Sequence, residues 1–266
     1  MERRKILIAT KTYPSISKKY KETVCTAGIL LDNDETPVCW IRIYPVRFRT
    51  LSFDRQYPRW SIVSAKIERN EKDYRVESYR IDDSSIEVIR SLGTSNYWQE
   101  RKSFVLPFQS PSISSISNQG RSLGIIKPLK IDSYFCRPAS SEWSDSQKAV
   151  LDQGDFFEEA SDLEKIPYQF GYKFTAQDGT QHKFSISDWE ISQLYRNCRN
   201  SSQKATLAER EKDALEKVRQ KLAERFMDED KIDLYFIVGN LKNHSKTFMI
   251  IGLFYPPFKS QLDLGI

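Results

Sequence analysis

Hydrophobic and polar positions alternate along much of the first 80 residues, which is the pattern of β-strands with one covered face. Short polar stretches that include turn residues such as Asp, Asn and Pro separate the runs. The predicted strands lie at residues 5–10, 23–31, 38–46, 60–70 and 74–81. Five short strands in so short a stretch predict a curled antiparallel sheet or a small β-barrel at the N-terminal end.

The pattern changes after residue 83. Residues 84–102 predict a helix that starts at Ser85, with Gly93 as its stop signal. The serine-rich stretch 110–119 predicts a connection between elements. Residues 122–135 predict extended chain interrupted by Pro128, which suits an edge strand or a bulge. The middle of the chain is therefore expected to be helical and then extended.

A β-hairpin is predicted over residues 168–186. Asp178 and Gly179 stand between two alternating runs, and glycine accepts the positive φ that tight hairpin turns require. A helix is predicted directly afterwards, because Ser187 and Glu190 have the spacing of a capping box. The second half of the chain therefore opens with a hairpin followed by a helix.

A longer amphipathic helix is predicted from Lys204 to Phe226, and an apolar hairpin follows at residues 233–240 and 246–257. The fold class is α+β: a curled antiparallel sheet or small barrel, a helical middle, and a hairpin-rich C-terminal half with two amphipathic helices. The predicted parts are a basic β-rich half at 1–138 (barrel-like over 1–83, helix and extended segment over 84–138), an acidic connecting segment at 139–165, and a hairpin–helix–helix–hairpin half at 166–266 that could form one compact domain with the first.

Composition narrows the class of protein. With 266 residues and 39% hydrophobic residues, the chain can bury a substantial core. No apolar run reaches the roughly 20 residues needed to span a bilayer, and the apolar run near the N-terminus is too short for a signal peptide. We therefore expect a cytoplasmic protein without membrane contact. Four widely spaced cysteines and two histidines predict neither a disulfide framework nor a metal site.

Positive charge is concentrated at the N-terminal end. Residues 1–60 hold 12 Lys and Arg against 6 Asp and Glu, although the whole chain has a net charge of only +5. Between residues 36 and 60 every basic side chain is arginine, and Asp54 is the single acid in this stretch. Arginine binds phosphate with two parallel hydrogen bonds and stacks on rings, so this choice favours recognition of a negatively charged partner over mere solubility.

The strand predicted at residues 38–46 carries the strongest functional signal. Its alternation places Cys39, Ile41 and Ile43 on one face and Trp40, Arg42 and Tyr44 on the other. If the second face is open, rings and a guanidinium are available for bases and phosphate. If a second layer covers it, Arg42 would be held by a carboxylate such as Glu68 or Glu77.

The sequence favours nucleic-acid binding without catalysis of its own. Aromatic side chains would stack on bases, while arginines and loop lysines would contact phosphate without reading sequence. No cofactor is expected. The predicted groove is formed by Lys11, Tyr13, Lys18, Lys19, Trp40, Arg42, Tyr44, Arg47, Arg49 and Arg59.

Two alternatives remain from other classes. A magnesium-dependent nuclease or phosphotransferase could use Asp188, Glu190 and His182, because acidic oxygens hold magnesium, although helix capping explains the two acids more simply. A protein-interaction subunit could dock through the helix predicted at residues 204–226. The usual phosphate-loop, dinucleotide-binding and serine-hydrolase motifs are missing from the sequence.

Overall fold

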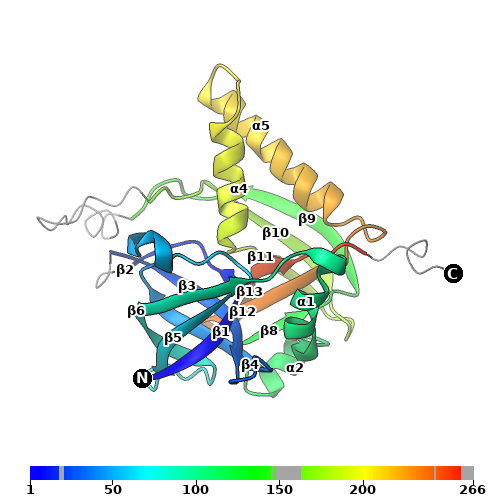
Figure 1. Cartoon of the computed structure of the whole chain (residues 1–266). Helices are drawn as coiled ribbons and strands as arrows, with labels where there is room; N and C mark the ends of the chain where they lie inside the picture. The colour runs from blue at the N-terminus through cyan, green and yellow to red at the C-terminus, as the bar shows by residue number, and fades with distance from the viewer. Residues whose placement is uncertain (18–20, 145–146, 148–162, 243, 259–266) are drawn as a thin grey trace, which may run out of the picture. The chain divides into compact units, whose positions relative to one another are not determined.

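The computed structural model describes residues 1–17, 21–144, 147, 163–242 and 244–258 (Figure 1). The chain forms two compact units. Unit 1 comprises Met1–Ser91 and Cys136–Phe170, and unit 2 comprises Leu92–Phe135 and Gly171–Ile266. The predicted α+β class is confirmed, with a curled sheet at the N-terminal end and hairpins with helices in the C-terminal half.

Unit 1 is built on a six-stranded mixed sheet that nearly closes into a ring. The strand order is β1-β5-β6-β4-β3-β2, and β1 also pairs with β3, so both edges of β1 are occupied. The β4–β6 pairing is parallel, while the other pairings are antiparallel. The strands are β1 Glu2–Lys11, β2 Ser15–Ser17, β3 Lys21–Leu31, β4 Pro37–Val46, β5 Ser61–Arg69 and β6 Ser78–Ser91, with short 3-10 turns at η1 Phe48–Thr50 and η2 Phe53–Arg55.

The ring is tightly packed where β1 meets β3. The run Ile6–Ala9 is fully buried on both faces of its strand. Opposite it, a Cβ on Gly28 would lie only 2.1 Å from the carbonyl oxygen of Leu7. Glycine at this position therefore lets two backbones approach closely, which the curvature of the sheet requires.

The helix predicted over residues 84–102 is wrong in its first part. Residues up to Ser91 extend β6, where Val88 pairs with Val63 and Arg90 pairs with Ile62 of β5. The helix α1 begins only at Ser95. Backbone pairing along β5 outweighs the local apolar spacing that had indicated a helix. The fifth predicted strand, at 74–81, likewise begins only at residue 78.

The chain after β6 carries two further sheets and the main helices. The sheets have the orders β11-β10-β9 and β13-β12-β8-β7. Tyr172 and Phe174 of β10 pack on Phe236 of β12, with ring centroids 5.3 and 5.0 Å apart. The elements are α1 Ser95–Val105, η3 Leu106–Phe108, β7 Gln109–Ser110, α2 Ile113–Asn118, β8 Leu123–Ile126, β9 Lys130–Pro138, β10 Tyr168–Thr175, β11 Gln181–Ser185, α4 Trp189–Asn200, α5 Leu207–Arg219, the short π-helix η4 Gln220–Arg225, β12 Tyr235–Leu241 and β13 His244–Phe254.

Both predicted hairpins of the C-terminal half are confirmed. Gly179 has φ of +79° in the turn between β10 and β11, as the Asp-Gly pair predicts. Strands β12 and β13 form the second hairpin. The helix predicted from Lys204 to Phe226 is also present, as α5 continued by η4, and a Thr206–Glu209 capping box starts it.

Two further local predictions are wrong. Asp188 rather than Ser187 caps α4, because the Asp188 carboxylate accepts a hydrogen bond from the Glu190 amide at 2.8 Å. The serine-rich stretch 110–119 contains the short helix α2 rather than a simple connection. Ile113 and Ile116, three positions apart, are both buried and give α2 its packed face.

The division at residues 138 and 166 remains a prediction. Within the acidic segment 139–165, residues 145–146 and 148–162 lie outside the described residues. The units defined by compactness each combine two stretches of chain.

Candidate nucleic-acid interface

The centre of the predicted groove lies inside unit 1. Trp40 is 4% exposed and Arg42 is 3% exposed. Residues 70–77 pass beside this part of β4, where the Arg42 amide donates to the Glu77 carbonyl at 2.7 Å. Burial lowers the pKa of the Arg42 guanidinium. Both faces of β4 are therefore covered here, and neither side chain offers a surface for bases or phosphate.

The loop between residues 70 and 77 is itself held by a buried ion pair. The Asp73 carboxylate accepts hydrogen bonds from Arg75 Nε at 2.9 Å and Arg75 Nη2 at 2.6 Å. Glu68, proposed as a partner for Arg42, instead lies 3.5 Å from the N-terminal amino group of Met1. The Asp73–Arg75 ion pair thus stabilises the loop at residues 70–77, which covers β4.

Lys11 and Arg59 are also buried, and they hold the loop at 47–60 against β1. Lys11 Nζ donates to the Tyr57 carbonyl at 2.7 Å and lies 3.9 Å from the centroid of the Phe48 ring. Arg59 Nε donates to the Ala9 carbonyl at 2.8 Å. These two cations hold the loop on β1. Because both side chains are buried, their positive charge is not available at the surface.

The loop at the start of the chain is only partly described. Tyr13 is half-buried, and its hydroxyl donates to the Glu164 carbonyl. Lys18 and Lys19 lie outside the described residues. Their contact with phosphate therefore remains a prediction.

Three residues of the predicted groove do reach the surface. Tyr44 is exposed, with its hydroxyl 3.2 Å from Thr23 Oγ1. Arg47 remains 51% exposed while it donates to Asp83 from Nε at 2.9 Å and from Nη2 at 2.8 Å. These hydrogen bonds hold the pKa of the Asp83 carboxyl below its usual value.

Arg49 is half-buried and donates to Glu22 at 3.0 Å. The exposed part of the predicted groove is therefore the loop that follows β4.

The most exposed aromatic residue of this loop was missed by the sequence reasoning. Phe53 is 92% exposed in the turn η2, and the half-buried Arg55 follows at the end of the same turn. Within the described residues, the Arg55 side chain forms no hydrogen bond or ion pair. The signal was an isolated phenylalanine in a polar connection, outside any alternating run.

A shallow hollow of about 490 Å³ adjoins Phe53. Phe48 and Tyr57 line it and meet edge to face with ring centroids 4.9 Å apart. Gln56 lines it as well, and its side-chain amide donates to the Leu51 carbonyl at 2.9 Å. We name the exposed Tyr44, Arg47 and Phe53, together with the half-buried Arg55, the loop surface. It combines rings, positive charge and a concave space within unit 1.

Asp188 and His182 of the alternative catalytic site take part in helix capping and in packing. Asp188 is buried, and its second carboxylate oxygen accepts from the Leu253 amide at 3.3 Å while the first caps α4. His182 packs beside both Phe174 and Phe184, with ring centroids 5.2 and 5.0 Å away. Burial lowers the pKa of this imidazole.

Glu190 is exposed in the first turn of α4. In the described part of the chain, no three His, Cys, Asp or Glu side chains are grouped so that they could hold a metal ion. Among the described residues, no helix is long and apolar enough to cross a membrane.

Comparisons with known proteins match the chain over almost its whole length. Residues 2–107 match the family model described as domain of unknown function DUF8758. A search of the curated proteins found no match. Among solved structures, a murine DNA-binding protein bound to double-stranded DNA matches with a TM-score of 0.33 and 10% sequence identity, over 98% of this chain and 97% of that one. Residues 113–264 match the model of a second family, which covers more than half of the chain, and the protein thus belongs to the family described as domain of unknown function DUF8757.

Proposed function

We propose that this protein binds single-stranded nucleic acid through the loop surface of unit 1. The observation that carries the proposal is Phe53, a phenylalanine 92% exposed on an arginine-containing loop. Leaving such a side chain in water forgoes roughly 1.5–3 kcal/mol of burial free energy. A base stacked on an aromatic ring contributes about 1–3 kcal/mol, so a bound base would recover a comparable amount.

The loop is well suited to this role because it is held in place before any ligand arrives. Lys11 and Arg59 tie it to β1 from beneath, through the Tyr57 and Ala9 carbonyls. The Arg47–Asp83 pair holds its other end. A surface that is already ordered loses little conformational entropy on binding, which favours affinity.

Charge on the loop supports a phosphate-bearing partner. Arg47 and Arg55 flank Phe53 in sequence, and Arg49 lies between them. Asp54 is the only acid between residues 45 and 60, and a carboxylate at that place could accept a hydrogen bond from an amino group of a base. We therefore expect phosphates to bind these arginines while the base stacks on Phe53.

Single strands fit this surface better than a duplex. The bases of a duplex are stacked inside the helix, so Phe53 could reach them only after the duplex opened, at a cost of a few kcal/mol. An unpaired base can instead stack on Phe53 and enter the hollow lined by Phe48 and Tyr57. The proposed activity is binding, without turnover of the nucleic acid.

The test is fluorescence anisotropy with labelled single-stranded DNA, single-stranded RNA and duplex DNA at several salt concentrations. We expect the single strands to bind more tightly, with affinity that falls as salt rises. Phe53→Ala should weaken this binding about 5- to 150-fold, which corresponds to the loss of one stacked base. Arg55→Ala should lower the slope of log affinity against log salt by about 0.7.

The matched control is Leu207→Ala, because Leu207 is also a large exposed apolar residue but lies in unit 2. This variant should bind like the unmodified chain. Lack of binding to all three nucleic acids at low salt would rule out the proposal. Unchanged affinity of the Phe53→Ala variant would move the binding site away from the loop surface.

A further inference from the structure

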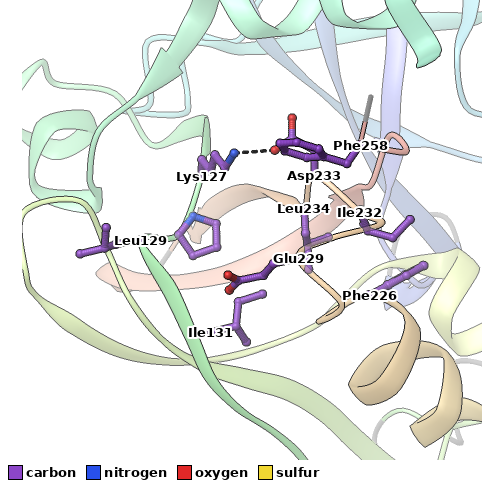
Figure 2. A pocket seen from close by; sticks show the side chains of 10 residues that line it. Lys127, Leu129, Ile131, Phe226, Glu229, Ile232, Asp233, Leu234 and Phe258 are labelled. Carbon is purple, nitrogen blue, oxygen red and sulfur yellow. Dashed lines mark hydrogen bonds and ion pairs between the residues drawn. The ribbon is translucent and has the colours of Figure 1, made fainter. Parts of the chain in front are cut away.

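Unit 2 contains a small pocket, and none of its lining residues belongs to the loop surface. It lies where the chain between β8 and β9 meets the turn before β12, and its volume is about 180 Å³ (Figure 2). Seven of its ten lining residues are apolar and three are charged, so polar atoms line it as well. Leu129 and Phe258 line it and are 59% and 49% exposed, although such side chains are normally covered.

Backbone hydrogen bonds make the pocket a preformed feature of unit 2. The Leu129 amide donates to the Thr175 carbonyl at 2.9 Å, and the Phe258 amide donates to the Lys231 carbonyl at 2.7 Å. The Asp233 amide donates to the Pro256 carbonyl at 2.9 Å. Both exposed apolar residues are therefore held in position by the main chain.

An ion pair fixes the polar side of the pocket. Lys127 Nζ lies 2.6 Å from Asp233 Oδ1, as the dashed line in Figure 2 shows. The Tyr235 hydroxyl donates to the other oxygen of Asp233 at 2.8 Å. These two charges compensate each other. Glu229, whose carboxylate extends among the lining side chains in Figure 2, makes no ion pair with a described residue and leaves the pocket with negative charge.

The size of the pocket decides what class of ligand it can take. Pockets for drug-sized molecules and cofactors usually measure about 300–1,000 Å³. An apolar cavity of about 150 Å³ is known to accept one benzene molecule. A pocket of about 180 Å³ therefore fits a single phenyl- or leucyl-sized group and not a whole small-molecule ligand.

We propose that this pocket anchors one large apolar side chain of a protein partner, next to a Lys or Arg of that partner which pairs with Glu229. A single aromatic or aliphatic anchor in a preformed pocket is how many protein interfaces concentrate their binding energy. Exposed Leu129 and Phe258 would be covered on binding. The inference does not depend on nucleic-acid binding, because every residue that carries it belongs to unit 2.

The probe is a phage-displayed library of random peptides, selected on the full chain. We expect enriched peptides to carry Phe, Leu or Ile within a few positions of Lys or Arg. Leu129→Glu should weaken binding of the best such peptide at least 10-fold, and the exposure of Leu129 makes this variant compatible with folding. Glu229→Gln should weaken it about 3- to 10-fold and should leave a peptide without the basic residue unaffected.

Leu207→Glu is the matched control, since it places the same charge on an exposed leucine of unit 2 outside the pocket. It should bind the peptide like the unmodified chain. Circular dichroism should show the same spectrum for all variants. The proposal is overturned if no peptide is enriched, if the enriched peptides are acidic, or if they bind the Leu129→Glu variant unchanged.

Discussion

Substitutions at the buried ion pair between Asp73 and Arg75 test how much this pair contributes to the stability of unit 1. Both side chains are buried, and the carboxylate accepts two hydrogen bonds from the guanidinium. Asp73→Asn would remove the carboxylate that accepts these two hydrogen bonds from the buried Arg75 guanidinium. Removing one partner of a buried pair typically costs about 3–5 kcal/mol of unfolding free energy. We expect a loss of this size for the single variant.

Replacing both charges should cost much less than replacing one. The double variant Asp73→Asn with Arg75→Met removes both charges of this pair, and such replacements of a buried pair are often neutral. The measurement is urea unfolding followed by tryptophan fluorescence, because Trp40 and Trp60 are buried in unit 1. The reasoning is refuted if Asp73→Asn costs less than about 1 kcal/mol, or if the double variant is no more stable than the single one.

The same pair predicts a dependence on pH. Burial alone would raise the pKa of Asp73, but hydrogen bonds and charge from Arg75 outweigh it and lower the pKa to about 2, from an ordinary value of 3.8. A lowered carboxyl pKa adds stability above the unfolded-state pKa, and this stability is lost as the pH falls through the folded-state value. The shift corresponds to about 2 kcal/mol. The stability difference between the unmodified chain and Asp73→Asn should therefore narrow by about 2 kcal/mol between pH 5 and pH 2.

Three further changes test other parts of the structure. Asp188→Ala should destabilise unit 2 by about 2–4 kcal/mol in thermal or urea unfolding, because it removes the cap of α4 and the acceptor of the Leu253 amide; a variant that stays fully stable and loses a magnesium-dependent activity would favour the catalytic alternative. Gly171→Ala should destabilise the chain by more than about 2 kcal/mol, since its Cβ would lie 2.3 Å from the Phe135 ring, and an unchanged unfolding midpoint would contradict this packing. Lys11→Met should lower stability but leave the salt dependence of nucleic-acid binding unchanged, because Lys11 is buried; a reduced salt slope would show instead that Lys11 meets phosphate.

Much of the fold could be predicted from the sequence because several of its turns and helices depend on residues close together in the chain. The hairpin at Asp178–Gly179 depends on a turn that only a few residue pairs favour. The long helix ending at Phe226 depends on apolar spacing over many residues, which averages out local exceptions. Where pairing partners are distant, as for residues 85–91 of β6 against β5, the local pattern indicated a helix and was misleading.

The candidate site was predicted only in outline, for a related reason. Alternation along β4 separates its two faces correctly but carries no information on what covers the second face. That cover is a turn more than 25 positions away, around Asp73 and Arg75. The exposed Phe53 could not be distinguished from a core phenylalanine by residue type. The arginine-rich region was therefore identified, while the exposure of each residue within it was not.

The nearly closed sheet of unit 1 has a consequence for how the chain is made. Ile6 of β1 pairs with Val63 of β5, about 60 positions later, and unit 1 also includes Cys136–Phe170. At synthesis rates of about 5–20 residues per second, β1 waits roughly 3–12 s on the ribosome before this partner is made. During that interval one edge of an apolar strand is open to pairing with other chains, which is a hazard for aggregation. Nascent chains stalled before β5 should therefore depend on chaperones far more than chains released after residue 170.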